Sequence, residues 1–380
     1  MKVLTNRVSR VLKTVATTVT LVVASVGSAS AGDLDFGKAG EPVKLVVGYQ
    51  PYYTEAWSGV VMRGKKFYEK YLPKGSSVEF AVGLQGAVIV NAMLAGKQHI
   101  GYVGDMPGIV STTKQQVADI RIVGALGLGK DQCNIFLTRK DAPAFASPKE
   151  ALKWLNGKNV AVPKGSCTDR FAQEVFKKEN ITPGAYLNQN IEVITSGLRA
   201  GKLDAAVVWE PTASRLVLEG LAKRVASGAS VDENDGSLLT MRADLIKQRP
   251  DIVKAWLNAE LDAQLYLADP KNSLEIARMA VEQTTGFTEQ VLWSSMFLEY
   301  PASEGGIKER LLLPFTITPD VEQLISTSAT FLHSIKSIHV PKLRPEAVMP
   351  EFTQEVLKER GLTAPIGAVQ ALPASEYKGK

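Results

Sequence analysis

The sequence comprises 380 residues, with 45% apolar residues and a formal net charge of +5. A chain of this length exceeds what one hydrophobic core usually supports, and the composition is that of a globular protein, so two lobes are expected. The small charge argues against a nucleic-acid partner. Beyond the N-terminus, no apolar run is long enough for a membrane receptor or a transporter subunit.

The first 31 residues have the pattern of a cleavable secretory signal peptide. Four cations precede an apolar stretch at 15–26 that is too short to span a bilayer comfortably, and Ala29-Ser30-Ala31 forms a cleavage triplet. These cations are Lys2, Arg7, Arg10 and Lys13. Without them the chain carries a charge of about +1. We therefore expect a soluble, monomeric protein of the bacterial periplasm.

From Val43 onward, short β-rich runs alternate with longer helical patterns, which is typical of βαβ units and a mainly parallel sheet. Thr54 is a candidate N-cap, Gly96 a helix stop, and Pro107 suits the first turn of a helix. The predicted elements are strand 43–49, helix 54–71, strand 78–82, helix 85–95, strand 99–103, helix 108–117 and strands 119–126 and 134–139.

A second alternating set begins near Asp131. It comprises helix 147–155, strand 159–162, helix 168–180, strand 191–194, helix 197–200, strand 205–209, a helix opened by Pro211, and strands 223–226 and 238–242. From Ala243 the pattern is almost entirely helical, most clearly over 251–267, 273–283, 288–299 and 320–337. Such helices cannot build a third sheet, so we expect them to pack on the first lobe.

Cys133 and Cys167 are the only cysteines. Export to an oxidising compartment favours a disulfide between them, and two unpaired thiols are the alternative.

Ligands of an open α/β sheet bind beyond the carboxyl ends of the strands, and here those positions carry aromatic and hydrogen-bonding residues. The candidate ligand-binding residues are Gln50, Tyr53, Trp57, Gln85, Asp105, Met106, Gly165, Ser166, Cys167, Thr168, Trp209 and Glu210. The turn at 165–169 joins a strand to a helix N-terminus, which is suited to an anion, although Ser166 and Asp169 could equally form a capping box.

Asp105 and Glu210 are suited to an ammonium group, which would widen the ligand class to zwitterions. Their alternative role is helix capping, since each lies beside a proline-opened helix. Trp57 could likewise pack in the core rather than line a cleft. The three histidines, His99, His333 and His339, form no metal or catalytic pattern, and no nucleophile elbow or phosphate loop is present. An enzyme, a metal site and a cofactor are therefore not expected.

The strand-end segments resemble, as an ordered set, those of the periplasmic substrate-binding proteins of nitrate, sulfonate and taurine ABC importers. The set covers most of residues 43–220. It is specific to the family only as a set, because each segment alone is short enough to occur in unrelated proteins. The segments are VGYQPY at 47–52, NAMLAG at 91–96, IGYVGDMP at 100–107, VAVPKGS at 160–166, AGKLDA at 200–205 and WEP at 209–211.

This resemblance implies a type II periplasmic binding protein fold, in which two lobes, each a mainly parallel sheet flanked by helices, are joined by two hinge crossings. It divides the chain into a signal peptide (1–31), the first part of lobe 1 (41–128), lobe 2 (129–230) and a return to lobe 1 with the C-terminal helices (231–380). A small organic anion or zwitterion, such as a sulfonate or taurine, would bind between the closing lobes. The implied partners are the membrane permease subunits of an importer.

Two alternatives stay open. Enzymes of thiamine-pyrimidine synthesis share this fold, although we find no counterpart here of their histidine and cysteine-rich segment. A periplasmic ligand sensor is the other alternative.

Overall fold

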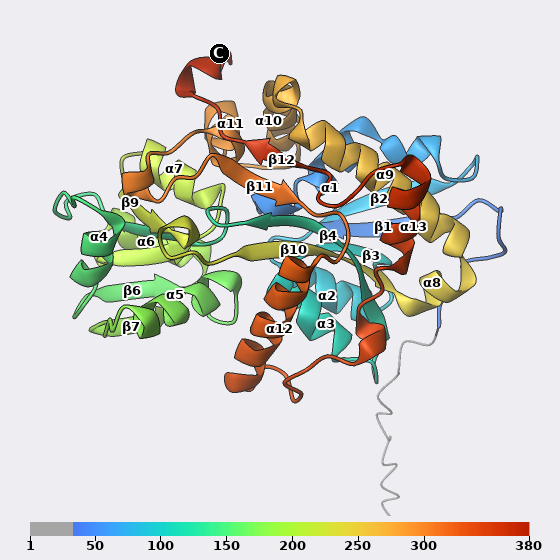
Figure 1. The fold of residues 1–380 in the computed structure, drawn as a ribbon, viewed down its shortest axis with the longest axis horizontal. Helices are drawn as coiled ribbons and strands as arrows, with labels where there is room; N and C mark the ends of the chain where they lie inside the picture. Colours follow the sequence, from blue (N-terminus) through green and yellow to red (C-terminus); the bar gives the residue numbers. More distant parts are fainter. Residues whose placement is uncertain (1–32, 380) are drawn as a thin grey trace, which may run out of the picture.

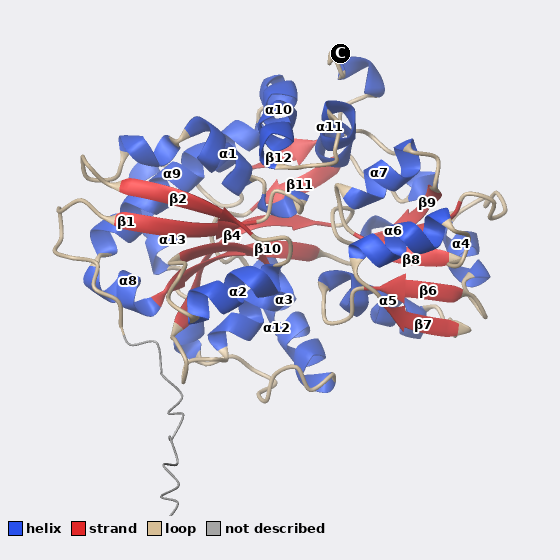
Figure 2. Cartoon of the chain, turned by 180° about the vertical axis from the view of Figure 1, so that it is seen from behind, coloured by secondary structure: helices blue, strands red, loops and turns tan. Residues whose placement is uncertain are grey.

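The computed structural model describes residues 33–379, so the predicted signal peptide at 1–31 lies outside the described residues. The chain forms two β-sheets that lie side by side, each flanked by helices (Figure 1, Figure 2). This architecture confirms the predicted α/β fold class. Among residues 33–379, no helix is both long and apolar enough to cross a membrane.

The larger sheet has seven strands in the order β12-β11-β4-β10-β3-β1-β2. β10 is antiparallel to β3 and β4, and β11 is antiparallel to β4 and β12, so these two strands run against the other five. The strands are β1 (Lys44–Tyr49), β2 (Ser77–Val82), β3 (Ile100–Gly104), β4 (Ile120–Gly129), β10 (Asp235–Arg242), β11 (Glu309–Leu313) and β12 (Gly367–Gln370).

The smaller sheet has five strands in the order β7-β6-β8-β5-β9. β6 is parallel to β7 and β8, whereas β5 is antiparallel to β8 and β9. The chain passes between the sheets at 130–134 and at 228–234. The strands are β5 (Ile135–Arg139), β6 (Asn159–Val162), β7 (Ala185–Asn188), β8 (Ala205–Val208) and β9 (Ala222–Ser227).

Helices cover both faces of the larger sheet, with α2, α3 and α12 on one side and α1 and α9 on the other (Figure 2). Buried apolar strands follow from this double cover, because neither face meets water. The α-helices of the described chain are α1 (Ser58–Lys65), α2 (Gly86–Leu94), α3 (Asp105–Thr112), α4 (Pro148–Trp154), α5 (Cys167–Lys178), α6 (Ile191–Arg199), α7 (Thr212–Leu218), α8 (Ala243–Gln248), α9 (Pro250–Ala268), α10 (Ser273–Gln283), α11 (Glu289–Phe297), α12 (Pro319–Ser334) and α13 (Glu351–Arg360).

The helix predicted over 54–71 is wrong as a continuous element. Lys66 has a φ of 55°, in the left-handed region, and ends α1. A residue in that conformation cannot continue a right-handed helix. Short 3-10 turns at Thr54–Ala56 and Phe67–Lys70 flank α1 instead. The helix predicted to follow Pro107 also starts earlier, because α3 already begins at Asp105.

The strand predicted at 191–194 is also wrong, because these residues begin α6. Their β-branched side chains favoured a strand, but the side chain of Asn190 accepts a hydrogen bond from the Val193 N–H at 2.9 Å and caps a helix. The C-terminal part is less helical than predicted, because β11 and β12 extend the larger sheet.

A buried ion network joins the two sheets where the chain first passes between them. The Asp131 carboxylate accepts hydrogen bonds from Arg310 on β11 and, at 3.2 Å, from Arg224 on β9. Arg224 also lies 3.4 Å from Glu210, and the Tyr300 ring lies against both guanidinium groups. The two acids and the two arginines therefore depend on one another for compensation of buried charge.

A buried carboxyl group beneath the larger sheet makes stability depend on pH. Burial raises the pKa of Glu260 to about 7, although hydrogen bonds from Tyr102 and Gln264 oppose the shift. The folded chain therefore keeps a proton that the unfolded chain loses near its ordinary pKa of 4.5. The free energy of unfolding should fall as pH rises from 4.5 to about 7, and the loss is complete above pH 7.

Glu260→Gln should remove this dependence, since glutamine has no proton to lose. The difference in the free energy of unfolding, variant minus wild type, should therefore increase with pH. Between pH 4.5 and pH 8 the increase should reach about 3 kcal/mol. Urea unfolding across this pH range measures it, with the exposed Glu346→Gln as the matched control. Parallel curves for wild type and Glu260→Gln would contradict the prediction.

Candidate functional site

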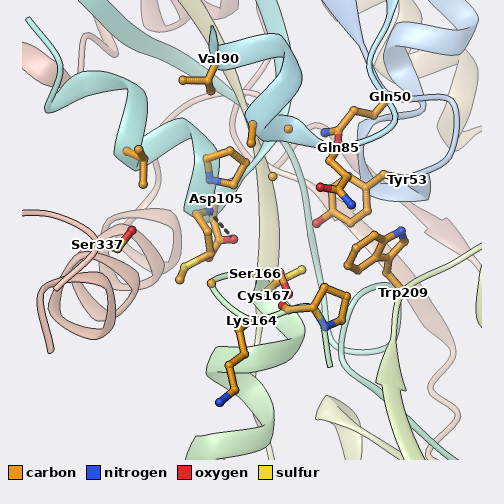
Figure 3. Close-up of a pocket in the computed structure, with 18 of the residues that line it drawn as sticks. Gln50, Tyr53, Gln85, Val90, Asp105, Lys164, Ser166, Cys167, Trp209 and Ser337 are labelled. Carbon is orange, nitrogen blue, oxygen red and sulfur yellow. Dashed lines mark hydrogen bonds between the residues drawn. The ribbon is translucent and has the colours of Figure 1, made fainter. Parts of the chain in front are cut away.

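A cavity of about 370 Å³ lies between the two sheets (Figure 3). Its size is that of a small-molecule site. Most of its wall follows the ends of β1, β3, β6 and β8, as expected where strands of an α/β protein face a crevice. The lining residues are Gln50, Tyr53, Gln85, Gly86, Ala87, Val90, Asn91, Gly104, Asp105, Met106, Pro107, Val110, Pro163, Lys164, Gly165, Ser166, Cys167, Trp209 and Ser337.

The helices α2, α3 and α5 all begin at this cavity. No N-cap side chain bonds to the first turn of any of them. The first N–H groups of a helix have no partner inside it and lie at the positive end of the helix dipole. At α3, the Asp105 carboxylate already accepts the Met106 N–H at 2.7 Å. The N-termini of α2 and α5, one from each side of the cavity, are therefore better placed to bind an anion.

A tight contact fixes the start of α2. Gly86 packs against the Pro107 ring of α3 so closely that any side chain at position 86 would collide with it. Glycine is thus required for the approach of α2 to α3. The two helix N-termini consequently lie together on one wall of the cavity.

The turn before α5 presents backbone rather than side-chain donors. Gly165 has a φ of 78°, which allows the sharp change of direction after β6. The Ser166 hydroxyl donates to the Pro163 carbonyl at 2.6 Å and accepts from Thr168, so its only hydrogen is already engaged. Asp169 accepts the Gly165 N–H, so the capping box considered from the sequence does not form. An anion at this turn would meet the first N–H groups of α5.

Nine of the twelve residues predicted to bind ligand line the cavity. They are Gln50, Tyr53, Gln85, Asp105, Met106, Gly165, Ser166, Cys167 and Trp209. The structure does not bring Trp57, Thr168 or Glu210 to its surface. The Trp57 ring is fully buried, and its Nε1 donates to the Pro51 carbonyl at 2.9 Å. Thr168 is buried in its own turn, and Glu210 caps α7 by accepting the Ser214 N–H at 2.8 Å.

Several lining residues were missed from the sequence. Val90 and Asn91 lie one helical turn beyond Ala87 on α2, so the period of the helix could have found them. Ser337 follows α12 and comes from a part of the chain for which no site was predicted. Its approach to the cavity results from packing of α12 against α3, which leaves no local sequence pattern.

Acidic groups cluster behind one wall of the cavity. The Tyr53 hydroxyl donates to Glu55 at 2.5 Å. Burial raises the pKa of Glu55 to about 8, and burial with Glu55 alongside raises the pKa of Asp235 well above its ordinary value. Burial also raises the pKa of Asp105, against the effect of Arg170 at 3.9 Å. Glu55 is therefore mostly protonated at pH 7, and this wall carries less negative charge than its acidic residues would suggest.

The two cysteines form a disulfide next to the cavity. Cys133 lies in the first passage between the sheets, Cys167 is the first residue of α5, and their Cα atoms are 6.4 Å apart. The bond therefore ties the N-terminus of α5 to the segment that joins the two sheets.

Replacing both cysteines with serine should lower the free energy of unfolding by about 3–4 kcal/mol, because the sequence separation of 34 sets the loop entropy that the bond removes from the unfolded chain. Chemical unfolding of Cys133→Ser/Cys167→Ser and wild type measures this. A loss below about 1 kcal/mol would show that the bond contributes little.

Proteins similar to this chain in sequence or fold include binding proteins and a desulfurization enzyme. The taurine-binding periplasmic protein of Escherichia coli (strain K12) is 26% identical over 253 residues, which cover 63% of this chain and 74% of that protein. The alkanesulfonate-binding protein of Xanthomonas axonopodis pv. citri, bound to MOPS, superposes with a TM-score of 0.62 at 18% identity, over 81% of this chain and 98% of that chain. A desulfurization enzyme has a TM-score of 0.59 at 16% identity, over 83% of this chain and 99% of that chain.

The family comparison agrees with the resemblance seen at the strand ends. The model of the NMT1-like family matches residues 38–281, which include the elements that build most of the cavity wall. The relatives with taurine and alkanesulfonate ligands confirm the resemblance to sulfonate- and taurine-binding proteins. On this evidence, the chain belongs to the NMT1-like family.

Proposed function

We propose that this protein is the solute-binding component of an ABC importer and captures a small organic anion, a sulfonate or a taurine-like zwitterion. The observation that carries the proposal is the cavity onto which α2 and α5 direct uncapped N-termini from opposite sides. The taurine-binding relative, 26% identical, supports the ligand class.

Anion binding here would rely on backbone dipoles rather than on a cationic side chain. Among residues 33–379, Lys164 is the one basic residue of the cavity wall. Figure 3 shows its side chain directed away from the other labelled residues, and its Nζ lies 5.0 Å from the centre of the Tyr186 ring. A sulfonate or carboxylate can accept several N–H bonds at once. The Tyr53 and Trp209 rings would contact the organic part of the ligand.

We propose binding rather than catalysis, although a desulfurization enzyme shares the fold. Cys167 is held in a disulfide, and the hydrogen of the Ser166 hydroxyl is engaged by a carbonyl. Neither lining residue is therefore an available nucleophile, and within the part of the chain that the structure describes no histidine lines the cavity.

Capture would involve closure of two lobes, which we place at 41–128 with 231–380, and at 129–230. The division of strands between the sheets supports this assignment, and the passages at 130–134 and 228–234 would act as hinges. We further propose that the protein acts in the periplasm, delivers its ligand to the permease subunits of the importer, and is a monomer.

Thermal unfolding with matched ligand pairs tests the proposal. Taurine, alkanesulfonates, nitrate and aromatic carboxylates are compared with neutral analogues of similar shape, such as the corresponding alcohols. A ligand at about a hundred times its Kd should add about 2.7 kcal/mol to the free energy of unfolding. If no anion stabilises the chain more than its neutral analogue, the proposed ligand class is wrong.

A further inference from the structure

The disulfide has an acidic neighbour that its structural role does not explain. The sulfur atoms of Cys133 and Cys167 and a carboxylate oxygen of Asp235 all lie within 4.8 Å of one another. These residues come from the first passage between the sheets, the start of α5 and the start of β10. Three groups of types that ligate metals thus meet where the two sheets are joined.

Asp235 is an unusual neighbour because it is fully buried and faces another buried carboxyl group. Within the described chain, its hydrogen-bond partner is the carboxyl group of Glu55, and no N–H or hydroxyl group donates to either Asp235 oxygen. A carboxylate that is buried without a compensating cation is unfavourable. Arg170 is the nearby cation, but its guanidinium bonds to Glu174 and to the Asn234 carbonyl. Two buried carboxyl groups that face each other without a bonded cation therefore indicate a position where a cation would be stabilised.

We propose that the reduced form of this protein binds a zinc-type divalent cation through the thiolates of Cys133 and Cys167 and the carboxylate of Asp235. A small dithiol reductant would break the S–S bond and become a disulfide itself, leaving two protein thiols. The cation would then displace the two thiol protons to solvent and bind the thiolates. The intact disulfide prevents this, because thiolate sulfur is the ligand.

The donor set and its position fit such an ion. Zinc accepts two cysteine sulfurs together with a carboxylate oxygen, and the three ligand atoms, all within 4.8 Å of one another, are close enough to surround one ion. Cys167 lines the cavity, which gives the ion a path from solvent and leaves a further coordination position toward the cavity. The carboxyl group of Glu55 lies beside Asp235 and would give the ion a further oxygen neighbour.

Cobalt substitution tests the proposal directly, because thiolate ligation of Co²⁺ gives a sulfur-to-metal charge-transfer band. The full chain is reduced with a phosphine, freed of reductant under argon and titrated with Co²⁺ in the absence of organic ligand. Zn²⁺ competition then gives the zinc affinity. We expect one Co²⁺ per reduced chain with the thiolate band, no binding by the oxidised chain, and an affinity at least about tenfold weaker in reduced Asp235→Asn.

Asp141→Asn is the matched control, since Asp141 is a largely exposed carboxylate outside the group formed by Cys133, Cys167 and Asp235, and it should bind as wild type does. A missing thiolate band, or equal affinity in wild type and Asp235→Asn, would overturn the proposal. If reduction unfolds the chain, zinc must restore the near-UV circular dichroism of the oxidised chain; failure to do so would also overturn it. The outcome is independent of the organic ligand, so the proposed function is not at stake in it.

Discussion

Replacing Asp131 with Asn should lower the free energy of unfolding by about 3–5 kcal/mol, the usual cost of leaving buried charge uncompensated. The Asp131 side chain is fully buried and accepts hydrogen bonds from two arginines, Arg224 and Arg310, whose side chains are also buried. Asparagine keeps the shape of the side chain but removes its charge. Arg224 still has Glu210 at 3.4 Å, whereas Arg310 is left with only the carbonyls of Ser295 and Met296.

The midpoint of urea unfolding, followed by near-UV circular dichroism, measures this loss. Asp232→Asn is the matched control, because that carboxylate pairs with Lys130 but is 86% exposed. Exposed ion pairs contribute little, so the control should stay within about 1 kcal/mol of wild type. A loss in Asp131→Asn no larger than in the control would show that the network does not depend on this carboxylate.

The ion network around Asp131 could not be predicted from the sequence, because its members come together only in the folded chain. Asp131, Arg224 and Arg310 meet only after two sheets have formed and β11 has been added to one of them. Local patterns gave most strands of both sheets, since buried strands are short apolar runs between turns. Strand β11 was not predicted, because it lies in a segment surrounded by helical patterns. Its partners β4 and β12 are also distant from it in the chain.

The candidate site likewise has features that local sequence predicts and features that depend on tertiary packing. Its strand-end residues could be predicted because parallel strands deliver their following residues to one edge. Whether such a residue faces the ligand or the protein depends on packing that the sequence does not display. Trp57 and Glu210 illustrate this, since one ring is buried in the core and one carboxylate is engaged by Arg224 and the start of α7.

A bulky residue at position 87 should abolish ligand capture without disturbing the fold. Ala87 lies in the first turn of α2 at the cavity wall and is exposed, so Ala87→Trp would place an indole in the 370 Å³ cavity without displacing core side chains. It would also cover the N–H groups at the start of α2. We expect the affinity for taurine or for a stabilising alkanesulfonate to fall at least about 100-fold, which corresponds to about 2.8 kcal/mol.

Isothermal titration of the variant and wild type measures the loss, and urea unfolding checks that stability changes by less than about 1 kcal/mol. Val88→Trp provides the matched control, because Val88 is the next residue of the same helix, is 52% exposed and does not line the cavity. It should bind as wild type does. If Ala87→Trp retains wild-type affinity, the ligand does not bind between α2 and α5, because an indole at position 87 would leave it no room there.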